Sequence, residues 1–247
     1  MTTSTFSRPS TKKPTPTAAR RAANSNLWEN RSMSESSFAH AHQFDDLEQQ
    51  RDAASLGMWI FLATEVMFFG GMFLGYTVYR SMYPEAFAAA SNRLGLAAGA
   101  INTTILILSS FTMASAVYFA ALARRRSLQV SLLLTIVLGA AFLGIKGYEY
   151  QEKFGDRLVP GALFTFPAPF ASAAEIFFSF YFAMTGMHAL HMIIGLGLLF
   201  YLFFGARRGR YTAGYYTPVE LVGLYWHFVD IIWIFLFPLL YLLGRHL

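Results

Sequence analysis

The sequence predicts an all-α membrane protein built as a five-helix transmembrane bundle. Of its 247 residues, 55% are hydrophobic and only 13% are charged, whereas soluble domains carry about 25% charged residues. Its mean hydropathy is +0.41. Five apolar segments are each long enough to cross the hydrocarbon layer, which takes about 20 residues of helix. We expect these spans at residues 53–79, 94–123, 128–148, 174–204 and 219–243.

The residues before the first span divide into two parts. Residues 1–42 are rich in Ser, Thr, Pro and Ala with scattered basic residues. Such a composition buries too little apolar surface to offset chain entropy, so we expect a disordered N-terminal arm. It lacks the compact apolar region of a secretory signal, so we expect the arm to stay attached. Residues 43–52 are polar and favour helix, which predicts a surface helix continuous with the first span.

Basic residues predict the orientation of the bundle. They cluster in the loops after the second and fourth spans, at Arg124, Arg125, Arg126, Arg207, Arg208 and Arg210. By the positive-inside rule these loops and the N-terminus face the cytoplasm, and the C-terminus lies outside. The net charge of +5 therefore reflects topology, and we expect no nucleic-acid partner. The same six arginines are candidates for contact with acidic lipid headgroups.

Polar side chains inside the spans are the candidate functional residues. They are Glu65, Asn102, His188, His191, His227 and Asp230. A carboxyl group at bilayer depth costs at least ~2.5 kcal/mol, so such groups face a protein interior, a polar ligand or a proton route. His188 and His191 are three residues apart, and so are His227 and Asp230, so we expect each pair to lie on one helix face. We therefore expect a polar cluster between spans.

Three interpretations of this cluster stay open from the residues. A metal or haem site would depend on His and carboxylate ligands, because the chain has no cysteine. However, the Glu-x-x-His repeats of di-metal bundles are missing, and His188 and His191 share a helix. A stand-alone transporter would use the buried groups as a proton or ion path, although five spans do not form an inverted repeat. A structural network would have His227 donate to Asp230 and Glu65 protonated or hydrogen-bonded.

Glycines at small-xxx-small spacing predict close helix approaches. Gly71 and Gly75 form one such pair in the first span, and Gly95 and Gly99 form another in the second. Small residues at this spacing permit tight backbone packing between membrane helices.

Three long motifs resemble subunit III of cytochrome c oxidase. The segment LGMWIFLATEVMFFGGMF (56–73) resembles its first motif, and Glu65 falls on the family's carbodiimide-reactive glutamate. The segment SFYFAMTGMHALHMIIGLG (179–197) resembles its Thr-Gly-x-His-x-x-His segment. The segment YWHFVDIIWIFLFPLLYLL (225–243) resembles its closing helix, and Glu220 matches a glutamate just upstream. Members commonly have seven spans, so this five-span chain resembles the shorter bacterial forms.

The resemblance implies an accessory role in aerobic respiration. The subunit binds no haem or copper, which belong to partner subunits, and we expect no metal on this chain. Its main partner would be subunit I, with subunit II and phospholipid, in a bacterial plasma membrane; a small subunit IV and a larger respiratory supercomplex are partners that the resemblance leaves open. It would stabilise subunit I and support proton uptake and the access of oxygen and lipid. Glu65 would be the residue most closely tied to this role. It would be supported by a polar seam of His188, His191, His227, Asp230 and Glu220.

Two further expectations follow from the resemblance. Related third subunits occur in quinol oxidases and beside nitric oxide reductases, but the motif at Glu65 is closest to the cytochrome c oxidase form. We expect Glu65 to be protonated, because burial disfavours the charged form and no Lys or Arg is expected inside the spans. A neutral carboxyl is the form that a carbodiimide attacks, so the label should be found on Glu65 rather than on Glu175 or Glu220.

Overall fold

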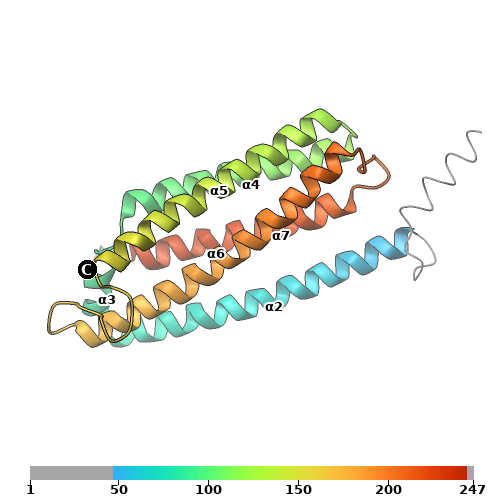
Figure 1. Cartoon of the computed structure of the whole chain (residues 1–247). Coiled ribbons are helices and arrows are strands. Elements are labelled where there is room, and N and C mark those ends of the chain that lie inside the picture. Colours follow the sequence, from blue (N-terminus) through green and yellow to red (C-terminus); the bar gives the residue numbers. More distant parts are fainter. Residues whose placement is uncertain (1–46, 244–247) are drawn as a thin grey trace, which may run out of the picture. The chain divides into compact units, whose positions relative to one another are not determined.

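The computed structural model describes residues 47–243, so the predicted arm (1–42) and residues 43–46 of the predicted surface helix lie outside the described part. The elements are α2 (Leu47–Met82), α3 (Pro84–Ser91), α4 (Leu96–Ala121), α5 (Arg125–Gly155), α6 (Ala171–Arg207), α7 (Thr217–Phe237) and the short π-helix η1 (Pro238–Leu242) (Figure 1). Between residues 47 and 243 the chain has no strand and five helical stretches long and apolar enough to cross a membrane. The predicted five-span helical fold is confirmed.

The helices extend beyond the predicted spans. The polar residues Leu47 to Asp52 are helical and continue directly into the first span. The third span was expected to end at residue 148, but α5 continues to Gly155. Glu149 and Lys153 lie beyond the predicted end of this span, yet they are only 2% exposed. The predicted end is therefore too early, because the helix continues past these charged side chains and they are buried.

Helix α7 lies at the centre of the packing. It packs against both α4 and α6, while α5 packs against α4 and α6. Trp226 of α7 is fully buried, and its indole nitrogen donates to Ser109 Oγ of α4 at 3.0 Å. A Cβ on Gly139 of α5 would stand 2.8 Å from the Trp226 ring, and one on Gly195 of α6 would stand 2.9 Å from it. These two glycines therefore let α5 and α6 close on the tryptophan.

The glycine pairs singled out in the sequence accommodate aromatic rings. A Cβ on Gly75 would lie 3.2 Å from the ring of Phe180, and a Cβ on Gly99 would lie 2.7 Å from the ring of Phe237. Nothing lies within 4 Å of a Cβ built on Gly71. The expectation of close backbone approach is therefore wrong for these pairs. One member of each pair makes room for a side chain.

The two arginine clusters share one end of the bundle. Arg125 Nε, at the start of α5, donates to the carbonyl oxygen of Ala206, at the end of α6, at 3.0 Å. The loops 122–124 and 208–216 therefore lie at one end, which we call the arginine end. Loop 156–170 and η1 lie at the other, the distal end, where Ser91 Oγ donates to the carbonyl oxygen of Leu240 at 2.7 Å. The six clustered arginines are all exposed.

Candidate functional site

Glu65 lies on the narrow face of α2 that contacts the bundle. The buried residues of α2 include Leu62, Phe69 and Tyr76, which recur every seven residues and so follow one stripe of the helix. Glu65 falls between the first two, and its side chain is 19% exposed. Away from this stripe α2 is open, as at Met67, which is 78% exposed. The carboxyl group therefore points into a protein contact.

Glu65 pairs with His191 of α6. The distance from His191 Nε2 to Glu65 Oε2 is 3.2 Å, and His191 Nδ1 lies 2.9 Å from the carbonyl oxygen of Met187. A carbonyl oxygen only accepts, so Nδ1 carries a hydrogen. Nε2 is therefore the ring nitrogen that faces the Glu65 carboxyl group, at ion-pair distance.

Aromatic rings surround the pair and fix the imidazole. The ring of Phe69 lies edge-on to the His191 ring, with centroids 5.5 Å apart and an interplanar angle of 61°, and the Tyr225 ring is stacked at 6.4 Å. The Tyr225 hydroxyl donates to the carbonyl oxygen of His191 at 3.0 Å. Helices α2, α6 and α7 thus meet around an aromatic-lined site that contains the Glu65–His191 pair. The structure brings together the sequence-predicted Glu65 and His191.

His188 faces other neighbours. It is 1% exposed, and its ring packs 5.5 Å from Phe142 and 5.2 Å from Trp233. Neither ring nitrogen has a hydrogen-bond partner in the described part of the chain. Residues three apart on a helix differ by about 60° in direction. This difference places His191 against α2 and His188 in the interior between α5, α6 and α7.

His227 and Asp230 lie between α4 and α7. His227 Nδ1 is 2.7 Å from Ser110 Oγ of α4, so the expected donation from His227 to Asp230 is wrong. The Asp230 carboxyl is 3% exposed and lies near the same hydroxyl. Within residues 47–243, neither of its oxygens has a hydrogen-bond partner. Glu220 lies apart from both, half-buried in the first turn of α7 at the arginine end.

The predicted polar seam is therefore divided among separate places. Glu65 and His191 lie between α2 and α6, His188 lies inside the bundle, and His227 with Asp230 lies between α4 and α7. The residues of the predicted seam form no single continuous cluster, because each helix presents its polar groups to different neighbours.

The sequence analysis missed a buried charged cluster. Lys146 and Glu149 of α5 are 4% and 2% exposed, so the expectation that no lysine lies inside the spans is wrong. We call this cluster, formed by Lys146, Glu149, Tyr181 of α6 and Tyr241 of η1, the lysine cage. Its Lys146 Nζ lies 3.0 Å from Glu149 Oε2, 2.9 Å from the Tyr241 hydroxyl and 3.3 Å from the Tyr181 hydroxyl.

The lysine cage is complete. An ammonium group has three donors, and all three are used. Both tyrosine hydroxyls donate to Glu149 Oε1, so both carboxylate oxygens accept as well. The Trp233 ring adds a cation–π contact, 5.0 Å from Lys146 Nζ. The signal in the sequence was the Lys-x-x-Glu spacing of Lys146 and Glu149 inside an apolar span, which places opposite charges on one helix face.

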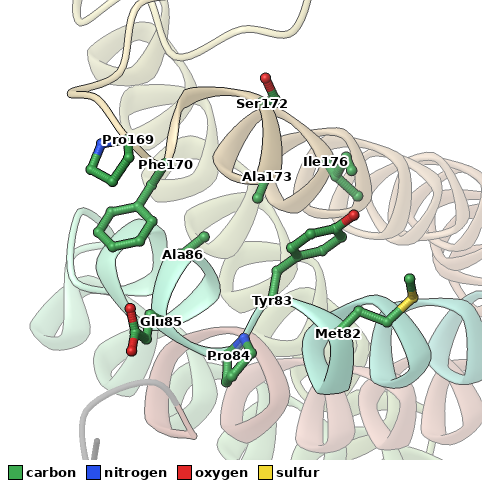
Figure 2. Close-up of a pocket in the computed structure, with 10 residues that line it drawn as sticks. All are labelled: Met82, Tyr83, Pro84, Glu85, Ala86, Pro169, Phe170, Ser172, Ala173 and Ile176. Atoms are coloured by element: carbon green, nitrogen blue, oxygen red, sulfur yellow. The ribbon is translucent and has the colours of Figure 1, made fainter.

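Two further features bear on ligands. Across the described helices and loops, no group of three or more His, Cys, Asp or Glu side chains could hold a metal ion. A cavity of about 480 Å³ lies at the distal end, lined by the corner between α2 and α3 and by the start of α6. Figure 2 shows the polar side chains of Tyr83, Glu85 and Ser172 among its mainly apolar lining residues.

Comparison with known proteins decides the family. A family model described as cytochrome c oxidase subunit III matches residues 19–245. The chain belongs to the cytochrome c oxidase subunit III family. The cytochrome c oxidase subunit 3 of Thermostichus vulcanus is 35% identical over 212 residues, which cover 83% of this chain and 92% of the relative. The resemblance noted in the sequence motifs is therefore confirmed.

Other subunit III relatives differ in their named electron donor. The cytochrome c oxidase subunit 3 of a Synechocystis species is 33% identical over 193 residues, covering 78% of this chain and 76% of the relative. The probable quinol oxidase subunit 3 of Staphylococcus haemolyticus is 28% identical over 192 residues, covering 76% and 88%. The family thus includes proteins named for both donors.

Proposed function

We propose that this chain is the accessory subunit III of a proton-pumping haem–copper terminal oxidase that carries electrons from cytochrome c to oxygen. The observation that carries the proposal is the family match over residues 19–245. The higher identity to a relative named for cytochrome c, 35% against 28% for the one named for quinol, favours cytochrome c as donor. Haem and copper belong to the partner subunits, and this chain contributes no redox group.

Its role in the complex is to support subunit I. The Glu65–His191 pair brings a carboxyl group and an imidazole together beside aromatic rings, which suits a subunit that keeps a proton-uptake entrance supplied. The partners are subunit I, subunit II and a small subunit IV, assembled in a bacterial plasma membrane and within a larger respiratory supercomplex. The arginine end faces the cytoplasm, as the positive-inside rule predicts, and the C-terminus faces outside.

Phospholipid is the proposed ligand at both ends of the bundle. The exposed arginines of the arginine end attract acidic headgroups at a cytoplasmic surface. The distal cavity of Figure 2, with Tyr83 and Ser172 beside an apolar wall, suits the boundary between headgroup and acyl chain. These contacts would give lipid and oxygen a route along the subunit.

A spectrum of the captured complex tests the proposed function. Membranes are solubilised gently, the tagged full chain is captured, and a reduced-minus-oxidised difference spectrum is recorded. We expect haem a bands together with oxygen uptake driven by reduced cytochrome c. Uptake driven only by quinol would support the quinol oxidase alternative. Capture without any haem-containing partner would contradict the proposal and favour a stand-alone transporter.

A further inference from the structure

A groove on the outer surface between α4 and α7 has the buried Asp230, unpartnered within residues 47–243, among its lining residues. Its volume is about 410 Å³, and its polar lining residues are Ser110, His227 and Asp230. The rim is apolar and open: Phe111 is 71% exposed and Ile231 is 49% exposed. We call it the Asp230 groove. It is a hydrophobic surface with one buried carboxyl group at its base.

The groove lies at mid-membrane depth. Ser110 is the fifteenth of the 26 residues of the span Leu96–Ala121, and Asp230 is the fourteenth of the 26 residues of the span Thr217–Leu242. Both therefore lie near the centre of the hydrocarbon layer. Lipid tails are the surrounding solvent at this depth, and they offer no hydrogen-bond donor.

The Asp230 carboxyl needs a donor that the described chain does not supply. Neither oxygen is hydrogen-bonded within residues 47–243, and the nearby Ser110 hydroxyl lies 2.7 Å from His227 Nδ1. An unsatisfied polar group in hydrocarbon is costly, so groups of this kind face a partner. The occupant of the groove must therefore present a hydrogen-bond donor, which excludes an acyl chain as its natural ligand.

The shape of the groove suits a helix. On α4 its lining follows Leu106, Ser110 and Ala114, a row spaced by four residues, and on α7 the row is His227, Ile231 and Ile234. Such rows over two turns form the grooves into which the ridge of a third helix packs. In membranes, helices associate through close packing and polar side chains that hydrogen-bond across the interface.

We propose that the Asp230 groove is a docking surface for a membrane-spanning helix of a partner oxidase subunit, which donates a hydrogen bond to Asp230 from a polar side chain at mid-membrane. This inference rests on the proposed function, because it assumes that the chain works inside a multi-subunit complex. It adds which face of the subunit is covered and what chemistry the covering helix carries.

Photocrosslinking in the native complex tests the docking surface. A photoreactive amino acid replaces Phe111 or Ile231 at the rim. Matched controls are Val137 on α5 and Met67 on α2, which are 56% and 78% exposed. We expect both rim positions to crosslink to the same partner subunit, and neither control to reach it with comparable yield. Rim adducts only to lipid, to a small quinone or to a second copy of this chain would overturn the proposal.

Substitution of the carboxyl group gives an independent readout. Asp230→Leu removes the hydrogen-bonding group, and we expect the recovery of the partner with the captured chain to fall about fivefold, as loss of one buried hydrogen bond predicts. Asp230→Asn keeps an acceptor and should retain most of the partner. Equal recovery for Asp230→Leu and wild type would contradict the proposal. A lower thermal stability of the free subunit with this change would also count against it, because it would mean that Asp230 serves the fold.

The two proposals fail in different ways. If the wild-type chain brings down no haem-containing partner, the proposed function fails. If it brings down the oxidase while the rim crosslinks miss every partner subunit and Asp230→Leu has no effect, only the docking surface fails.

Discussion

The lysine cage and the Asp230 groove both place ionisable groups inside the membrane spans, but only the cage is satisfied by the chain itself. In the cage, Lys146 uses its donors on Glu149 and two tyrosines, and Glu149 accepts at both oxygens. In the groove, Asp230 has no hydrogen-bond partner within the described part of the chain. The difference indicates that the hydrogen bonds of the cage form when the chain folds, whereas a hydrogen bond to Asp230 forms when the subunit assembles with its partner.

The contacts of each region agree with this distinction. The cage joins α5, α6 and η1 and is closed to the surroundings, since both charged residues are below 5% exposed. The groove opens onto the surface between α4 and α7, with an exposed apolar rim. Substitutions in the two regions should therefore change different properties, namely folding stability in one and association in the other.

The largest effect is expected in the cage. Glu149→Leu leaves Lys146 as an uncompensated buried charge, which should lower the free energy of unfolding of the detergent-solubilised subunit by about 3–5 kcal/mol. Glu152→Leu on the same helix is the matched control. Its carboxyl is 55% exposed, and Lys153 keeps Asp156 at 4.0 Å. Because the Glu152 carboxyl is more than half exposed and the buried Lys153 keeps its second partner, we expect its loss to cost about 1 kcal/mol or less. Denaturant unfolding followed by tryptophan fluorescence measures both.

A double variant checks the physical reason. Replacing the pair by Lys146→Met with Glu149→Leu removes both charges, and apolar replacement of a buried pair is often neutral or stabilising. We therefore expect the double variant to recover most of the lost stability. A double variant as unstable as Glu149→Leu would mean that hydrogen bonds of the tyrosines, rather than the stranded charge, dominate the effect.

An effect of intermediate size on folding stability is expected where α6 packs against α7, because α7 borders both the lysine cage and the Asp230 groove. Gly195→Ala pushes a Cβ to 2.9 Å from the Trp226 ring, and overpacking of this kind costs about 1–3 kcal/mol. Gly197→Ala is the control, because nothing lies within 4 Å of its Cβ position. Thermal unfolding of the two variants should differ clearly. Equal melting temperatures would show that α6 and α7 are less closely packed than described.

The smallest effect on stability, with the opposite sign, is expected in the groove. Asp230→Leu removes an unsatisfied buried carboxyl, so the free subunit should gain on the order of 1 kcal/mol in unfolding free energy. The same denaturant series measures it, with Ile231→Leu as a control that keeps the apolar rim. A loss of stability would show that the free subunit already contains a partner for Asp230.

Carbodiimide labelling compares the carboxyl groups chemically without changing stability. We expect peptide mapping to find the label on Glu65, which lies inside the membrane span beside His191 and is partly accessible. Glu149 should stay unlabelled, because it is buried and accepts from three donors. Glu65→Gln serves as the control and should lose the label. Labelling confined to Glu175 or Glu220 would contradict the assignment of Glu65.

The sequence predicted the spans well and singled out Glu65 and His191, without pairing them, because both results depend on strong local signals. Long apolar segments have few alternatives to membrane helices, and the motifs around Glu65 and His191 resemble a known family. The lysine cage was missed because Lys146 and Glu149 resemble the charged boundary of a span. Only the partners from α6 and η1 show that their charges are neutralised inside.

The polar seam failed as a prediction for a geometric reason. Sequence spacing places His188 and His191 on similar faces of α6, but a difference of about 60° in direction is enough to face different helices. His191 reaches Glu65 across the α2 contact, while His188 packs against Trp233. Which neighbour each histidine contacts depends on how the helices pack together, and the sequence of one span does not specify that packing.

Removal of this subunit from the purified oxidase tests the central claim most directly. Mild detergent treatment depletes the chain, and haem content, copper content and oxygen uptake are then followed over many turnovers, with wild-type chain or Glu65→Gln added back. An accessory role without redox chemistry predicts unchanged haem and copper and a normal initial rate. It also predicts faster loss of activity during turnover, which wild-type chain reverses more fully than Glu65→Gln. Loss of haem or copper together with the chain would contradict the account, and so would oxygen uptake that lasts for as many turnovers without the chain as with it.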